Sequence, residues 1–229
     1  MNPQTFPLTQ GVAVKRPKMC RFTFTLVLLG TVEFLASGIV HAQVETQRVF
    51  LLVAKAGLMD PTFSKSVVLA VRPDDGGPIG VILNRPSTVE LRSLYPDRAD
   101  MANRRDLVFL GGPVEPDALL FAFRSPRKPA NGLLVAEDIY LSGFSEVLAE
   151  LLKHPENAGQ QRFFVGFSGW AAGQLEEEIA QGGWYVLRFD ARAVFDMNPL
   201  TMYEEMLNRA TVPRIEAARG IDLARAVPR

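Results

Sequence analysis

The sequence has few of the side chains from which catalytic and metal centres are most often built. Cysteine occurs once, as Cys20, and histidine occurs only twice in 229 residues. A single cysteine excludes a disulfide within the chain, and this shortage of cysteine and histidine excludes the usual zinc sites. After residue 43 only His154 remains and there is no cysteine, so a Cys–His nucleophile pair is excluded there. We therefore expect neither a metal nor another cofactor.

Glycine-rich loops that bind phosphate are also missing. The glycine pairs at 76–77 and 111–112 lack the spacing of nucleotide-binding loops. Ser168 stands in Gly-Phe-Ser-Gly-Trp, without the glycine that a nucleophile elbow needs two positions after its serine. The remaining catalytic hypothesis uses carboxylates such as Asp60 and Glu178, which would have to converge in a cleft. The sequence therefore favours a protein that is not an enzyme.

Charge is balanced overall but unevenly distributed. Residues 1–43 carry four Lys or Arg and one Glu, whereas residues 211–229 carry four Arg and two acidic side chains. The segment between them holds 17 Lys or Arg against 22 Asp or Glu and is therefore acidic. Nucleic acids are bound largely through basic side chains that neutralise phosphates, so we do not expect a nucleic-acid partner.

An apolar run at residues 22–40 follows a basic lead. With the small residue Ala42 after it, this pattern is typical of a secretory signal peptide cleaved between Ala42 and Gln43. Its 19 residues also suit an uncleaved membrane anchor. Two features oppose this interpretation. Glu33 places a carboxylate inside the apolar run, and the basic lead is long unless translation starts at Met19. The alternatives are a misassigned start codon or a buried helix. We expect a periplasmic or membrane-anchored protein if the segment is translated, and a cytoplasmic one otherwise.

From residue 44, short apolar runs alternate with turn residues. Strands are expected at residues 48–54, 66–71, 79–83, 107–110, 119–123, 133–136, 162–167 and 184–189. Helices are expected at residues 89–94, 144–153, 171–181 and 201–210, with a short one near 192. Ser142 is expected to cap the helix at 144–153. The strands come in hairpin-like groups with helices inserted later, which favours an α+β fold with mostly antiparallel pairing.

Three segments follow from these patterns. Residues 1–43 form a signal-peptide-like or anchor segment, residues 44–210 a single compact domain, and residues 211–229 a loose C-terminal tail without periodicity. The domain contains four motifs, which are residues 57–67 (GLMDPTFSKSV), 80–86 (GVILNRP), 111–114 (GGPV) and 166–179 (GFSGWAAGQLEEEI). Trp184 follows the last motif. In this order and spacing the motifs resemble those of the bacterial YqgE/AlgH family, over about residues 48–209.

The resemblance implies a compact α+β domain. Its sheet is expected to be branched and mostly antiparallel, with a small barrel-like portion, and to be surrounded by helices. No catalytic residues are defined for the family, so the resemblance carries none over. One branch is described as a regulator of alginate synthesis, and members are labelled transcriptional regulators. The chain departs from the family in residues 1–43, in the tail after residue 210, and in Tyr203, where a tryptophan is expected.

Six motif residues are candidates for a ligand or partner site. They are Asp60, Asn84, Arg85, Trp170, Gln174 and Glu178. The segment around Trp170 leads from a strand into a helix, whose N-terminal amides would bind an anion. The alternative is that Gly169 and Gly173 allow a tight turn and close packing, with Trp170 in the core. Arg85 would likewise present its guanidinium to an anionic ligand, or else pair with Asp60 or Glu178.

Three functions remain open on this basis. The first is a non-catalytic regulatory or interaction module that binds a protein partner or a small ligand. The second is a transcriptional regulator, which the acidic domain and the lack of a helix-turn-helix pattern oppose. The third is a carboxylate-based enzyme of unknown substrate. We expect the first, with membrane contact confined to residues 22–40.

Overall fold

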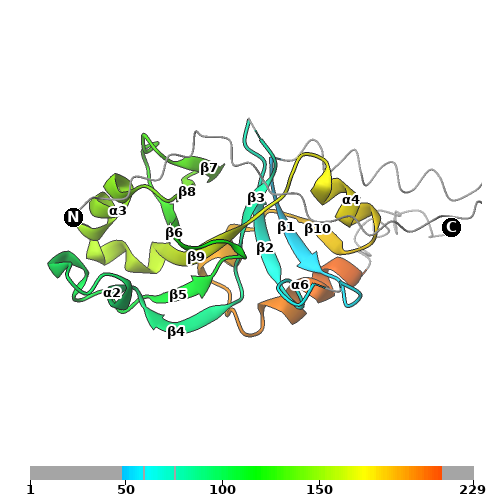
Figure 1. Ribbon diagram of the computed structural model, residues 1–229, viewed down its shortest axis with the longest axis horizontal. Helices are drawn as coiled ribbons and strands as arrows, with labels where there is room; N and C mark the ends of the chain where they lie inside the picture. Colours follow the sequence, from blue (N-terminus) through cyan, green and yellow to red (C-terminus); the bar gives the residue numbers. More distant parts are fainter. Residues whose placement is uncertain (1–47, 59, 75, 213–229) are drawn as a thin grey trace, which may run out of the picture.

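Short β-branched and aromatic runs pair into one ten-stranded sheet in the computed structural model (Figure 1). The structure describes residues 48–212, apart from 59 and 75. The strands are β1 Val49–Ala54, β2 Val67–Val71, β3 Ile79–Ile82, β4 Pro86–Glu90, β5 Leu107–Leu110, β6 Val114–Arg124, β7 Leu133–Ala136, β8 Ile139–Ser142, β9 Gln161–Gly169 and β10 Trp184–Arg188. Eight of them follow the order β10-β1-β2-β3-β9-β6-β8-β7. The other two lie beside this path, where β5 pairs with β9 and β4 pairs with β5.

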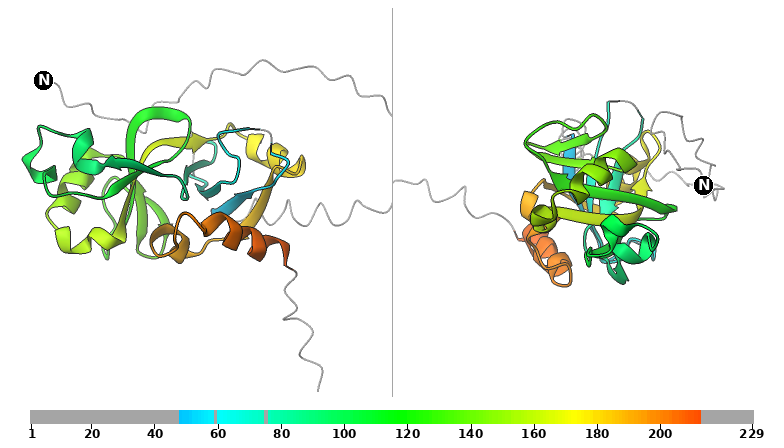
Figure 2. Two further views of the ribbon diagram at one scale, coloured as in Figure 1. Left: turned by 90° about the horizontal axis from the view of Figure 1, so that it is seen from below. Right: turned by 90° about the vertical axis from the view of Figure 1, so that its left-hand side faces the viewer.

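The sheet is branched and curls into a half-barrel (Figure 2). Strand β9 is the branch point, because it pairs with β3, β5 and β6. Among the described strands only the β5–β9 pair is parallel, and the other pairs are antiparallel. The expected fold class, a single α+β domain with a mostly antiparallel branched sheet and a partly barrel-like shape, is confirmed.

Helices cover the two ends of the molecule. They are α2 Leu91–Leu94, α3 Ser145–Leu152, α4 Gln174–Ala180, α5 Ala191–Phe195 and α6 Met202–Thr211, with 3-10 turns at Ala99–Met101 and Pro155–Gln160. Helices α2 and α3 lie at the left end in Figure 1, and α4 and α6 at the right. One hydrophobic cluster packs around Phe50 and Trp184 at the α4–α6 end, and a second packs around Phe121 and Phe163 at the α2–α3 end.

Two glycines allow the backbones of β5 and β9 to cross closely at the branch point. The Gly111 amide donates to the carbonyl of Val165 at 2.8 Å, and the Gly111 carbonyl accepts from Ile82 at 2.9 Å. A Cβ at Gly111 would lie 2.3 Å from the Gly166 oxygen, and Gly166 itself has φ +67°. The expected close packing at Gly169 is absent, since a Cβ there would meet nothing nearer than 3.5 Å. Gly173 does allow the expected turn, with φ +80°.

Several sequence-based boundaries need correction. Strand β4 takes up residues expected in a helix from 89, so α2 begins only at Leu91. Strand β8 is not predicted by the sequence pattern, and Ser142 is its last residue rather than a helix cap. The Ser142 hydroxyl donates to the Asn131 carbonyl at 2.6 Å, while Phe144 occupies the N-cap of α3. Ser142 therefore joins the end of β8 to the loop before β7, and does not cap α3.

Tyr203, which stands where the family resemblance implies a tryptophan, fixes α6 to the sheet. Its ring is buried and its hydroxyl donates to the Ala54 carbonyl at 2.9 Å. Within the described residues no helix is both long and apolar enough to cross a membrane. The predictions of a signal peptide or anchor at residues 22–40 and of cleavage between Ala42 and Gln43 lie outside the described residues. So does the predicted loose tail at residues 211–229 from 213 on, whereas Thr211 is the last residue of α6.

Candidate functional site

Three of the six candidate residues form one hydrogen-bonded cluster around the Glu178 carboxylate. Oε2 accepts from the indole nitrogens of Trp170 at 3.0 Å and Trp184 at 2.9 Å. Oε1 accepts from the Gln174 amide at 3.0 Å. The Gln174 side-chain oxygen in turn accepts from the Ala171 amide at 3.0 Å, at the start of α4. Both indole rings are buried, so the carboxylate satisfies two N–H groups that would otherwise be buried without an acceptor.

Phe63 joins this cluster to the first motif. Its ring stacks on Trp170 with centroids 6.4 Å apart, and meets the edge of Trp184 at 5.5 Å. The chain around Phe63 is a tight turn, in which the Asp60 carbonyl accepts from the amides of Phe63 and Ser64 at 3.1 Å. The turn thus holds an aromatic ring against both tryptophans. We call Phe63, Trp170, Gln174, Glu178 and Trp184 the tryptophan cluster.

The other three candidates stabilise the same turn, Asp60 from within it and Asn84 and Arg85 from the end of β3. Asn84 accepts from the Val67 amide at 2.8 Å and donates to the Lys65 carbonyl at 2.9 Å. Arg85 Nη2 donates to the Ser64 carbonyl at 3.0 Å. Burial lowers the pKa of Arg85, which the nearby Asp60 carboxylate partly opposes. Asp60 Oδ1 itself accepts from the Thr62 amide at 2.7 Å.

The six motif candidates therefore have partners within the domain. Asn84 binds loop backbone, as the alternative interpretation expects. Arg85 binds a carbonyl, and among the described residues no ion pair joins it to Asp60 or Glu178, although the Asp60 carboxylate is near enough to influence its pKa. Helix α4 starts with Gly173 at its N-cap and has only seven residues. Its first turn carries Glu176 and Glu177, whose negative charges would repel an anion at this helix end. The motifs build the scaffold around the Phe63 turn.

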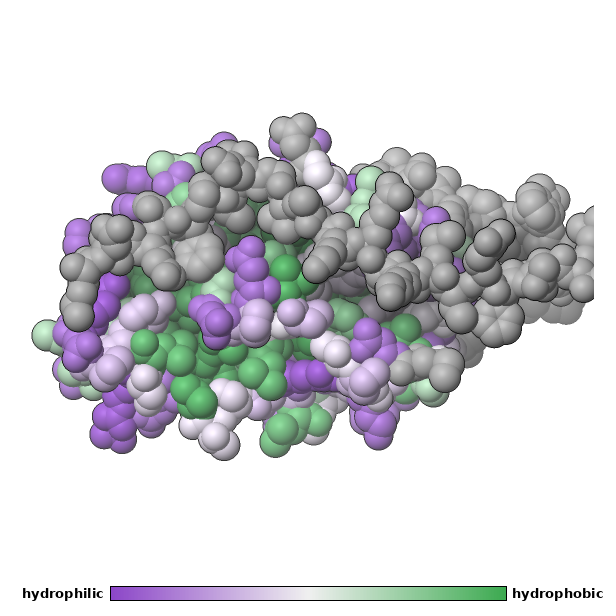
Figure 3. Space-filling model, in the orientation of Figure 1, coloured by the Kyte–Doolittle hydropathy of each residue, from purple (hydrophilic) through white to green (hydrophobic). Residues whose placement is uncertain are grey.

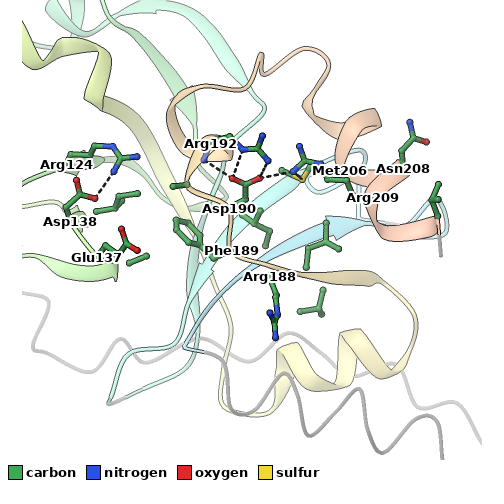
Figure 4. A pocket seen from close by; sticks show the side chains of 17 residues that line it. Arg124, Glu137, Asp138, Arg188, Phe189, Asp190, Arg192, Met206, Asn208 and Arg209 are labelled. Carbon is green, nitrogen blue, oxygen red and sulfur yellow. Dashed lines mark hydrogen bonds and ion pairs between the residues drawn. The ribbon is translucent and has the colours of Figure 1, made fainter. Parts of the chain in front are cut away.

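A groove on a different part of the molecule is open to a ligand. It has a volume of about 1290 Å³ and lies between β10, the β7–β8 turn and the ends of α5 and α6 (Figure 4). Its lining residues are Leu51, Arg124, Ala136, Glu137, Asp138, Ile139, Val186, Leu187, Arg188, Phe189, Asp190, Ala191, Arg192, Met206, Asn208, Arg209 and Val212. Apolar side chains from four strands, β1, β7, β8 and β10, thus line it together with several arginines.

Two arginines share one carboxylate at the α5–α6 end of the groove. Asp190 accepts from the backbone amide, Nε and Nη2 of Arg192 at 2.8–3.1 Å, and from Arg209 Nη1 at 2.8 Å. These hydrogen bonds, those from the Arg192 side chain most of all, lower the pKa of Asp190 to about 2 although partial burial opposes the shift. Within the described residues nothing pairs with the exposed guanidinium of Arg188. In Figure 4 the Arg188 side chain points away from the Asp190 cluster, so it is a separate positive charge on the lining of the groove.

The opposite end of the groove is formed by the β7–β8 turn. Arg124 Nη1 pairs with Asp138 at 2.7 Å, and its guanidinium lies 5.3 Å from the centre of the Phe195 ring. Glu137 beside it is exposed and has φ +44°, a conformation that side-chain-bearing residues rarely adopt. In Figure 4 the Arg124–Asp138 pair and the Asp190 cluster lie on opposite sides of Phe189.

The ion pairs of Asp190 make a pH-dependent contribution to stability. Its folded-state pKa of about 2 lies below the ordinary value of 3.8, so the contribution is complete above that ordinary value and is lost as the pH falls through about 2. The difference in unfolding free energy between wild type and Asp190→Asn should therefore be constant above pH ~5 and shrink between pH ~4 and pH ~2. Asp117→Asn, at an exposed position, is the matched control. Urea unfolding across that range tests this, and a difference independent of pH would contradict it.

A second exposed feature is apolar and lies apart from the groove. Strands β4 and β5 leave Val89 40%, Leu107 47% and Leu110 50% exposed. The face shown in Figure 3 has an apolar area at its lower left, where β4 and β5 lie. Among the described residues no group of three or more His, Cys, Asp or Glu side chains is arranged to hold a metal ion. The groove differs from this apolar patch in being hollowed, with a volume of about 1290 Å³.

Sequence reasoning did not find the groove. Its arginines and Asp190 are spread from residue 124 to residue 209, and each is ordinary for a solvated surface in its local sequence. The one available signal was the acidic N-cap Asp190 between Arg188 and Arg192, directly after an expected strand. A cap of this kind is common, so it points to a helix start rather than to a site.

Fold and groove together define a class of protein, an α+β domain whose curled sheet leaves a groove at its open side. Residues 51–214 match the model of the AlgH-like family, DUF179. The chain belongs to this family. It is 38% identical over 165 residues to a UPF0301 protein of Streptomyces coelicolor, covering 69% of this chain and 84% of the relative. A UPF0301 protein of Mycobacterium tuberculosis is 35% identical over 199 residues, covering 81% and 95%.

Two solved structures have the same fold. The solution structure of AlgH from Pseudomonas aeruginosa matches with a TM-score of 0.60 at 22% identity, over 76% of this chain and 94% of that one. The crystal structure of a Corynebacterium diphtheriae protein matches with a TM-score of 0.59 at 21% identity, over 72% and 87%. At these identities the likeness concerns the fold alone.

Proposed function

We propose that this member of the family is a binding module that recognises a protein partner or a small ligand in the groove, and that it does not catalyse a reaction. The observation that carries the proposal is the groove itself, in which the unpaired guanidinium of Arg188 borders apolar side chains. Sites that bind ligands commonly combine apolar lining with a few polar groups that fix orientation. A regulatory role, as the family resemblance implies, would act through such a partner.

The carboxylates available for catalysis support a non-catalytic role. Both oxygens of Glu178 are used as hydrogen-bond acceptors inside the tryptophan cluster. Asp60 is part of the Phe63 turn. Asp190 does line the groove, but a pKa of about 2 makes it a weak base at neutral pH, and two guanidiniums already occupy it. The hydrogen bonds of Glu178, Asp60 and Asp190 within the domain therefore account for the positions of these three carboxylates.

Binding should depend on Arg188, because among the described lining residues its guanidinium is the cation without a partner. The probe is a panel of monocarboxylates, dicarboxylates, phosphate monoesters and random short peptides, added to the full-length chain and followed by saturation-transfer NMR. Reversing the charge with Arg188→Glu should weaken the detected binding at least about tenfold, the size expected for a charge-assisted hydrogen bond. Arg127→Glu makes the same charge change at an exposed position outside the groove and should leave binding unchanged.

Two results would overturn the proposal. One is binding that is indifferent to Arg188→Glu or equally sensitive to Arg127→Glu. The other is steady turnover of a panel member by the purified chain that is abolished by Asp60→Asn or Glu178→Gln, since this would make the motif carboxylates catalytic.

A further inference from the structure

We infer that the groove accepts an extended, acidic segment of a partner protein, which adds to the sheet as a strand beside β10. This inference rests on the proposed function, since it names the class of partner for the same groove. It is carried by three features of the described residues, which are a free strand edge, the path of the groove along that edge, and the charge at its end.

Strand β10 is one end of the sheet. It pairs only with β1, in an antiparallel register that joins Leu51 to Leu187 and Leu52 to Val186. An edge strand presents a row of backbone N–H and C=O groups that can pair with another chain. Several peptide-recognition domains use such an edge, with backbone hydrogen bonds for affinity and side-chain pockets for specificity.

The register shows which backbone groups of β10 face outward. The Lys55 amide donates to the Gly183 carbonyl at 2.9 Å, so Gly183 faces β1. Backbone groups of successive residues in a strand point to alternate sides, so Tyr185 and Leu187 also face β1. Val186 and Arg188 consequently direct their N–H and C=O groups away from β1. No hydrogen bond from these outward groups to another described residue is present.

The groove follows this edge. It is lined by Val186, Leu187 and Arg188, three consecutive residues of β10. Since consecutive side chains of a strand point to opposite faces of the sheet, a groove that touches all three reaches the strand edge. Leu51 and Met206 extend its lining from this edge over one face of the β1–β10 pair. Its other wall is the β7–β8 turn, and β7 is the opposite end of the sheet order. The groove is therefore the seam between the two ends of the curled sheet.

Charge and apolar lining indicate the composition of the segment. Arg192 and Arg209 share the Asp190 carboxylate at the α5–α6 end, and Arg188 lines the groove separately, with its guanidinium unpaired among the described residues. An acidic side chain of the segment would be attracted there. Ala136, Leu187 and Phe189 line the groove, are only partly buried, and would receive apolar side chains at alternate positions of the added strand. The volume of about 1290 Å³ exceeds the ~300–1,000 Å³ of most small-molecule sites, which favours a peptide segment.

A proline at position 186 tests strand addition directly. Proline removes the outward N–H of Val186 but no ladder bond to β1, and edge strands tolerate proline at such positions. A displayed library of random nonapeptides is panned on the full-length chain, with Val186→Ala as the matched control that keeps the N–H. We expect enriched sequences that alternate apolar and polar residues and carry Asp or Glu near one end. Val186→Pro should weaken their binding at least about tenfold, while Val186→Ala changes it less than about threefold.

The peptide offers a second test that does not depend on how Val186→Pro folds. Synthetic copies of the enriched sequences are N-methylated at either the odd or the even positions. Because only one set of amides faces β10 in an added strand, one methylated set should lose at least about tenfold in affinity and the other should retain binding. Replacing the acidic residues by Lys should weaken binding by a similar factor.

The remaining outcomes count against the inference. Equal binding by Val186→Pro, or equal effects of both methylated sets, would show that peptides do not pair with β10. Failure to enrich peptides, while small carboxylates still bind in an Arg188-dependent way, would remove the strand and leave the proposed function intact. Concentration-dependent dimerisation of the chain that Val186→Pro abolishes would identify a second copy as the occupant in place of a separate partner.

Discussion

Replacing Gly166 by alanine is expected to lower the free energy of unfolding by about 3–5 kcal/mol, at the upper end of single-residue effects. Gly166 has φ +67°, and a left-handed backbone costs an alanine roughly 1–2 kcal/mol. The added Cβ would also lie 2.4 Å from the Gly112 oxygen, a backbone atom that cannot move without disturbing the branch point. The two penalties act together because β3, β5 and β6 all meet β9 in this region.

Gly169→Ala is the matched control for this experiment. It lies in the same strand and the same motif, and its Cβ would make only ordinary contacts, the nearest at 3.5 Å from the Phe167 ring. Its effect should stay within about 1 kcal/mol of zero, since alanine is slightly preferred to glycine in a strand. Urea unfolding of the two variants measures both values. Equal effects would mean that the close crossing of β5 and β9 does not have the geometry described above.

Replacing Glu178 by leucine should cost about 2–5 kcal/mol, the second large effect. The substitution removes the acceptor of two buried indole N–H groups, and leaving a buried donor without a partner costs roughly 1–3 kcal/mol each. Trp170 and Trp184 are the two tryptophans of the chain, so their fluorescence reports on the change directly. Both the unfolding midpoint and the emission maximum should therefore shift.

Two further substitutions distinguish the loss of the hydrogen bonds from the effect of placing an apolar residue on α4. Glu178→Gln keeps a carbonyl oxygen for the indoles and should recover most of the loss. Glu177→Leu places the same apolar residue at the exposed neighbouring position and should change stability by less than about 1 kcal/mol. If Glu178→Leu were as mild as Glu177→Leu, the carboxylate would not be the centre of the tryptophan cluster.

Much of the fold follows from local sequence patterns, because β-rich runs and turn residues are close together in the chain. The strands containing Phe50, Leu69 and Phe164 are predicted near their observed bounds. Strand β4 is missed because its polar sequence, PSTVE, pairs only at an edge and has little apolar periodicity. Strand β8 is missed since its four residues follow a two-residue turn in which Glu137 adopts a left-handed conformation.

The candidate site is harder to predict from sequence for a different reason. The motifs predict a binding site because they contain glycine, tryptophan and charged residues. In the structure, however, Trp170, Arg85 and Glu178 form hydrogen bonds to groups within the domain. The two indole N–H groups find their acceptor, Glu178, within eight positions of the chain, but the burial of their rings depends on long-range packing. Phe63 and Trp170, which stack on each other, are more than a hundred positions apart. The groove arises from the closing of the sheet, which no local pattern encodes.

The measurement that most directly tests whether this domain binds at the open seam of its sheet is amide hydrogen exchange of the full-length chain, alone and with an enriched acidic peptide. In the free protein the amides of Val186 and Arg188 should exchange fast, whereas those of Tyr185 and Leu187 are protected by β1. The peptide should protect Val186 and Arg188 and leave the indole N–H signals of Trp170 and Trp184 unchanged. Unprotected β10 amides together with shifted indole signals would place the binding site at the tryptophan cluster and contradict the proposal.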